Sequence, residues 1–99
     1  MGSGVSREQR GSFSGTGSLL TVDSVGFRPR QIRLINTASG DEATWTESMA
    51  DASMYKRVAA GTGAMVTTGG LTPTATGFTL GTDADLNASG EQVLFICVE

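Results

Sequence analysis

The sequence contains no histidine, and its 99 residues include only one cysteine, two prolines and one tryptophan. Without histidine, the chain cannot build a Ser-His-Asp or Cys-His catalytic arrangement, or a zinc site of His and Cys ligands within one chain. The single cysteine, Cys97, excludes an intrachain disulfide. Because Cys97 lies in an apolar segment, we interpret it as a small buried thiol rather than a nucleophile.

Long apolar runs are also missing. No stretch approaches the roughly eighteen apolar residues of a membrane span, and the N-terminus lacks the apolar run of a signal peptide. We therefore expect a soluble protein that is made in a cytoplasm and has no membrane partner.

The formal net charge of −3 is unevenly distributed. Residues 1–33 carry five arginines against two acidic residues, whereas residues 34–99 carry one lysine and one arginine against eight acidic residues. This asymmetry indicates docking onto an acidic surface. The arginines are too sparse to predict direct binding to nucleic acid.

Period-two alternation of apolar and polar residues recurs along the chain, while helical periodicity is nearly absent. The alternation predicts strands, separated by Gly-rich turns, over 18–25, 30–37, 43–48, 64–68, 76–81 and 91–98. The segment 49–60 predicts a loop or short turn followed by a strand, and GGLTP (69–73) predicts a turn. EQVLFICV (91–98) is apolar on both faces, so we expect a central strand covered on both sides. Together these features predict an all-β fold over residues 19–99, a small antiparallel sandwich or barrel of jelly-roll type.

The first eighteen residues have a different composition. Ten of them are Gly or Ser, which predicts an extended, flexible N-terminal arm that becomes ordered on a partner. In that arm we expect Arg7 and Arg10 to pair with carboxylates of the partner, and Val5 and Phe13 to provide apolar anchors. The remaining residues, about eighty, form only a marginal core, so we expect copies of the chain to complete one another.

Two acidic pairs deserve a chemical interpretation, Glu42 with Glu47 and Asp83 with Asp85. A glycosidase needs two carboxylates at ~5–9 Å across a cleft, for which so small a domain has little room. We interpret all four as solvated turn residues and predict no catalytic residue.

The segment TDADLNASGE contains the only pattern that resembles a metal loop. Asp83, Asp85 and Asn87 alternate as oxygen ligands do at the start of an EF-hand. Ala88 stands where that loop needs glycine, and Leu94 where it needs glutamate, so the EF-hand interpretation fails. A weak surface cation site and a turn-making role stay open as alternatives, and no cofactor is predicted.

Three stretches resemble a family of small virion proteins of tailed bacteriophages. They are GTGSLLTVDSVGFRPRQIRLIN (15–36), ATWTESMADASMYK (43–56) and VTTGGLTPTATGFTLGTDADLN (66–87). The resemblance implies a structural protein of the virion that decorates and cements the outer capsid surface across capsomer seams. It also implies the major capsid protein as partner and a homo-oligomer, commonly a trimer, and it carries no binding residues with it.

A tail, fibre or baseplate module that recognises a receptor or glycan is the alternative. In that case Trp45 and Tyr55 would stack on sugar rings, with hydrogen bonds from the acidic loops.

Overall fold

The computed structural model describes residues 7–59, 61 and 63–99. These residues contain eight strands and no helix, and therefore no helix long and apolar enough to cross a membrane. The strands are β1 (Glu8–Ser14), β2 (Leu20–Val22), β3 (Gln31–Asn36), β4 (Glu42–Thr46), β5 (Ser53–Arg57), β6 (Gly63–Thr74), β7 (Gly77–Leu80) and β8 (Gln92–Val98).

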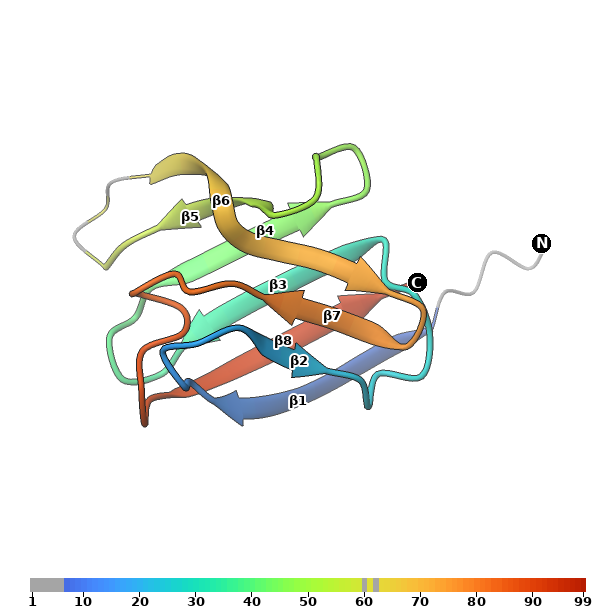
Figure 1. Ribbon diagram of the computed structural model, residues 1–99, viewed down its shortest axis with the longest axis horizontal. Coiled ribbons are helices and arrows are strands. Elements are labelled where there is room, and N and C mark those ends of the chain that lie inside the picture. The colour runs from blue at the N-terminus through green and yellow to red at the C-terminus, as the bar shows by residue number, and fades with distance from the viewer. Residues whose placement is uncertain (1–6, 60, 62) are drawn as a thin grey trace.

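All eight strands belong to one antiparallel sheet in the order β1-β8-β3-β4-β5-β6-β7-β2. The sheet curves into a nearly closed barrel, in which the second half of β6, β7 and β2 lie in front of β3, β8 and β1 (Figure 1). In the part of the chain that the structure describes, no ladder joins β1 to β2, so these two strands are the free edges. The predicted all-β barrel or sandwich is confirmed at this level. A jelly roll consists of two Greek keys, whereas β3 to β7 follow one another here as a meander.

The core lies between the two layers and is built from the inward residues of each strand. In β3, Ile32 and Leu34 are fully buried while Gln31 and Arg33 are exposed, as the alternation predicts. The ring of Phe78 on β7 meets the ring of Phe95 on β8 edge to face, with centroids 5.6 Å apart. These contacts join the front and back layers into a single core.

The predicted flexible arm over residues 1–18 is not confirmed. Residues 1–6, including Val5, lie outside the described residues, but Glu8–Ser14 form the strand β1 along the whole of β8. Phe13 points inward, and its ring lies 6.3 Å from that of Phe78. Gly11 has no side chain, which leaves room for the ring of Phe95 beneath it. Part of the Gly/Ser-rich segment therefore forms an edge strand with mostly small side chains at Gly11, Ser12 and Ser14.

Two further predictions need correction. The strand at 64–68 and the turn at 69–73 are one long strand, β6, which bends where Gly69 adopts a φ of 73° and the pairing with β5 shifts register. The last strand is covered on one face only: Val93, Phe95 and Cys97 are buried, while Leu94 is exposed on the opposite face. The loop or turn followed by a strand in 49–60 is confirmed, with β5 as the strand.

Candidate assembly surface

The outward side chains of six neighbouring strands form one continuous face. Residues that lie directly opposite in an antiparallel ladder point to the same side of the sheet. One row across the sheet contains Arg10, Ile96, Arg33, Thr44, Tyr55 and Met65. The next row contains Ser12, Leu94, Ile35, Glu42, Arg57 and Gly63. We call these two rows the outer sheet face.

Large apolar side chains are exposed on this face. Tyr55 is 44% exposed, Met65 53% and Leu94 40%, and Ile35 and Ile96 are half-buried between them. Tyr55 lies across Gly63 on the neighbouring strand, where any side chain would collide with its ring. Scattered apolar residues are normal on a surface, but a group of five on adjacent strands is typical of a site that another molecule covers.

Arginine is the main charged residue of the outer sheet face. Arg10 forms an ion pair with Glu8 at 2.8 Å, and Arg57 lies opposite Glu42 across the β4–β5 ladder. Arg33 has no ion pair among the described residues, and its neighbours across the ladders are Ile96 and Thr44. An exposed guanidinium without an ion pair, beside the apolar side chain of Ile96, favours a partner that presents a carboxylate.

Of the predicted contact residues, Val5 lies outside the described residues, while Arg7, Arg10 and Phe13 lie in different surroundings. Arg10 lies on the outer sheet face, whereas Phe13 is half-buried and packs inward against the core, on the opposite face of β1. Arg7 donates from both Nε and Nη2 to the Glu99 carboxylate, and its guanidinium lies 5.2 Å from the ring centroid of Phe27. This hydrogen bonding raises the pKa of Arg7 and lowers that of Glu99. Arg7 therefore already has a carboxylate partner within the chain.

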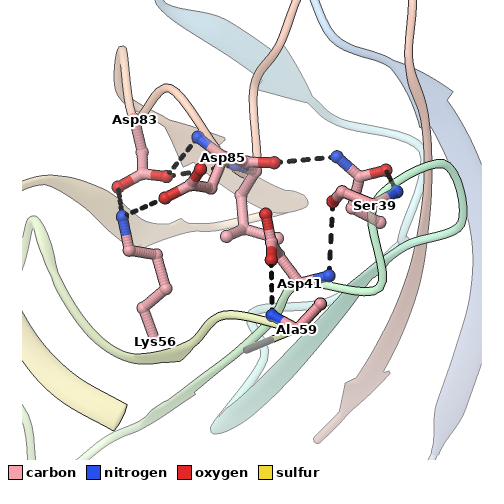
Figure 2. A network of polar contacts seen from close by, with 8 residues as sticks. Ser39, Asp41, Lys56, Ala59, Asp83 and Asp85 are labelled. Atoms are coloured by element: carbon pink, nitrogen blue, oxygen red, sulfur yellow. Dashed lines mark hydrogen bonds and ion pairs between the residues drawn. The ribbon is translucent and has the colours of Figure 1, made fainter. Parts of the chain in front are cut away.

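The segment TDADLNASGE, whose pattern resembles a metal loop, instead binds the ammonium group of Lys56. The Lys56 ammonium lies 2.9 Å from Asp83 Oδ2 and 2.8 Å from Asp85 Oδ2 (Figure 2). Asp83 Oδ1 accepts the backbone N–H groups of Asp85 and Leu86, which confirms the turn-making interpretation. Burial by itself lowers the pKa of Lys56, but the hydrogen bonds and charges of the two aspartates together raise it. The ammonium occupies the place that a cation would take.

Asn87, the third member of that pattern, is buried and fully engaged with backbone. Its Nδ2 donates to the carbonyls of Ser18 and Gly81, and its Oδ1 accepts the Thr16 N–H at 2.8 Å. Asn36 is buried as well, and its Nδ2 donates to the Asp85 backbone carbonyl and to the Glu91 carboxylate. These amides hold the loop between β7 and β8 over one end of the barrel.

A hollow of about 560 Å³ is lined by Arg28, Pro29, Arg30, Trp45, Glu47, Met49, Asp51 and Glu99. Its lining mixes basic and acidic groups, and Arg30 and Glu47 lie 3.7 Å apart there. Glu42 lines a different hollow, so Glu42 and Glu47 do not face each other across a cleft. Trp45 is 3% exposed and donates Nε1–H to the Ala50 carbonyl, which leaves no ring face for a sugar.

Within residues 7–59, 61 and 63–99, no three His, Cys, Asp or Glu side chains are grouped as a metal would require. Cys97 is buried, and this burial raises its pKa to about 12. The outer sheet face is not apparent from the sequence, because the apolar residues of 91–98 predict a strand that is buried on both faces. No family model, curated protein or solved structure matches the chain.

Proposed function

We propose that this chain is a structural protein of a tailed-phage virion that decorates and cements the outer capsid surface. The outer sheet face is the observation that supports a binding role, since it exposes Tyr55, Met65 and Leu94 around an arginine without an ion partner. The phage assignment depends on the sequence resemblance of residues 15–87. In this proposal the outer sheet face contacts the major capsid protein, and the role is not enzymatic.

Cementing follows from selective binding to one state of the shell. A protein that binds across a seam between capsomers binds the assembled, expanded shell and not its separated subunits. Mass action then shifts the equilibrium toward the assembled shell. Contacts repeated over many seams, and between copies of the chain, add avidity that no single contact has to supply.

The partner surface should be acidic and partly apolar. Arg33 would pair with a shell carboxylate, and burial of Tyr55 and Leu94 would supply the apolar contribution. A protein–protein interface of standard size buries about 800 Å² on each partner, an area that a face of several strands can provide.

Reversing the charge of Arg33 tests this surface. We expect Arg33→Glu to weaken binding to expanded capsids that lack the protein by at least about tenfold, because a hot-spot arginine contributes more than ~1.4 kcal/mol. The measurement is cosedimentation of the purified chain with such capsids. Arg30→Glu is the matched control, because it makes the same charge change at an exposed position that lines the hollow instead.

Equal binding of Arg33→Glu and wild type would reject the outer sheet face as the capsid contact. Failure of the wild-type chain to bind any capsid would reject the function. The alternative of a tail, fibre or baseplate module is separated by copy number, since a cement protein occurs in many copies per particle and a tail module in few.

A further inference from the structure

The strand β1 is a free edge of the sheet. Among the described residues it pairs with β8 along Glu8–Ser14 and with no other strand, and it lies at the outer margin of the back layer (Figure 1). Proteins usually protect such edges with proline, a bulge or a strong net charge. β1 contains no proline, its register with β8 is continuous, and its two charges, Glu8 and Arg10, neutralise each other.

The hydrogen bonds at both ends of β1 show which backbone groups are free. The Glu99 N–H donates to the Arg7 carbonyl, and the Gly15 N–H donates to the Glu91 carbonyl, each at 2.9 Å. Residues bonded to the partner strand alternate in an antiparallel ladder, so the odd-numbered residues of β1 bond to β8. The N–H and C=O groups of the alternate residues therefore point to the free edge; these residues are Glu8, Arg10, Ser12 and Ser14.

We propose that a second copy of this chain pairs with this edge, β1 against β1 and antiparallel, about a two-fold axis at Gly11. In this register Glu8 lies opposite Ser14 of the other copy, and Arg10 lies opposite Ser12. Each of the four residues whose backbone groups point to the free edge then exchanges both backbone hydrogen bonds with the residue opposite. A shift of two residues in either direction loses one of these four pairs, so this register makes the most bonds within β1.

The side chains of β1 fit a second copy. Small residues, Gly11, Ser12 and Ser14, occupy the axis and one end of the strand, so the two backbones can approach closely. A shift that centres the axis on Arg10 would place two arginines directly opposite, which is unfavourable. In the proposed register each charge faces a serine, and Glu8 holds Arg10 by an ion pair on the side away from the axis.

The partial exposure of Phe13 is an independent argument that a second copy pairs with β1. It is one of the core phenylalanines, yet it is only half-buried because β1 has no neighbour on its free side. The proposed register places Gln9 of the second copy directly opposite Phe13, on the same face. The aliphatic part of that glutamine would cover the exposed part of the ring. The pairing is two-fold, unlike the trimer that the resemblance implies, and it does not depend on the proposed function.

Sedimentation equilibrium of the purified chain tests the pairing. We expect a dimer, and we expect Ser12→Pro to weaken it by about tenfold or more, because two symmetry-related N–H donors are lost. The Ser12 N–H does not bond to β8, and an edge strand tolerates proline at such a position. Ser12→Val is the matched control, since it retains the donor and favours a strand. A circular dichroism spectrum identical to that of wild type verifies that each variant is folded.

A wild-type chain that stays monomeric up to about 1 mM would overturn the proposal, because weaker association is not specific. A trimer, or a dimer unaffected by Ser12→Pro, would overturn it as well.

Disulfide cross-linking tests the register without relying on a proline variant. Opposed residues in a bonded antiparallel pair have Cα atoms ~5.5 Å apart, within reach of a disulfide. We therefore expect an oxidised mixture of the Arg10→Cys and Ser12→Cys variants to form a mixed dimer. Either variant alone should cross-link much less, because its own positions lie diagonally at ~7–8 Å. Equal cross-linking of the mixture and the single variants would overturn the register. The native Cys97 is buried, and the wild-type chain is the control.

Discussion

Asn87 joins two loops with one side chain, the β7–β8 loop and the connection between β1 and β2. It is almost fully buried, and it hydrogen-bonds to backbone groups of Thr16, Ser18 and Gly81. Asn87→Ala would remove these three hydrogen bonds to backbone groups, so we expect the free energy of unfolding to fall by about 3 kcal/mol. Chemical denaturation measures this loss. The exposed neighbour Ser89 is the control, because Ser89→Ala should change stability by less than about 0.5 kcal/mol. Equal effects of the two substitutions would contradict this role.

Cys97 makes stability depend on pH in the alkaline range. Burial raises the pKa of its thiol to about 12 in the folded chain, whereas an unfolded thiol ionises near ~8.5. A group whose pKa is higher in the folded state contributes its full stability below the unfolded pKa and loses it as pH rises above that value. We expect the free energy of unfolding to decline as pH rises from about 8.5 toward the folded value of about 12, by up to ~1.4 kcal/mol per pH unit. Cys97→Ala should lack this decline, and parallel pH profiles would contradict the assignment.

At the scale of the strands, local pattern predicted most of the sheet. β3, β4 and β7 are found where alternation is clear and turn residues flank it, because one face of each strand is buried in the core. β1 was missed because Gly11, Ser12 and Ser14 give no alternation. Its order comes from pairing with β8, a contact between residues far apart in the sequence. β6 was divided in two because Gly69 and Gly70 resemble a turn, although the chain only bends there.

The outer sheet face was not predictable either, because it is formed by residues that lie far apart in the sequence. Arg33, Tyr55 and Leu94 come onto one face only through the registers of three ladders. By contrast, the turn-making role of Asp83 was predictable, since an aspartate accepts hydrogen bonds from backbone groups two and three residues ahead.

Lys56 joins β5 to the loop between β7 and β8. It is the only lysine of the sequence, and its ammonium bonds to Asp83 and Asp85. Since Asp83 is buried, we expect Lys56→Gln to lower the free energy of unfolding by roughly 2 kcal/mol at neutral pH.

The pH dependence of that difference tests the ion pair itself. The pKa of Lys56 is raised on folding, so its contribution is complete below the ordinary value of 10.5 and is lost as pH rises through the higher folded value. The difference between wild type and Lys56→Gln should therefore be constant from about pH 6 to 9 and shrink above pH 10.5. Measuring both in a Cys97→Ala background removes the thiol contribution. A difference that does not change with pH would indicate that the lysine acts through packing of its aliphatic chain.

The whole molecule has one core, and Phe78 lies at its centre. Its ring contacts Phe13 on β1 and Phe95 on β8, and its strand β7 pairs with β2 and β6. Phe78 therefore contacts one edge strand, β1, through Phe13, and its own strand pairs with the other edge strand, β2. Loss of Phe78 should loosen the two layers together, because no second core supports either one.

We expect Phe78→Ala to lower the free energy of unfolding by about 3–5 kcal/mol, a large fraction of the stability of a domain of this size. Phe78→Leu should cost less, because it leaves a smaller cavity. Trp45 is buried and reports on the back layer by fluorescence, while circular dichroism reports on all strands. If the core is single, both signals should change at the same denaturant concentration in each variant. Two separate transitions would show instead that the back layer stays folded without the front one, and that β1 keeps its place on β8 without Phe78.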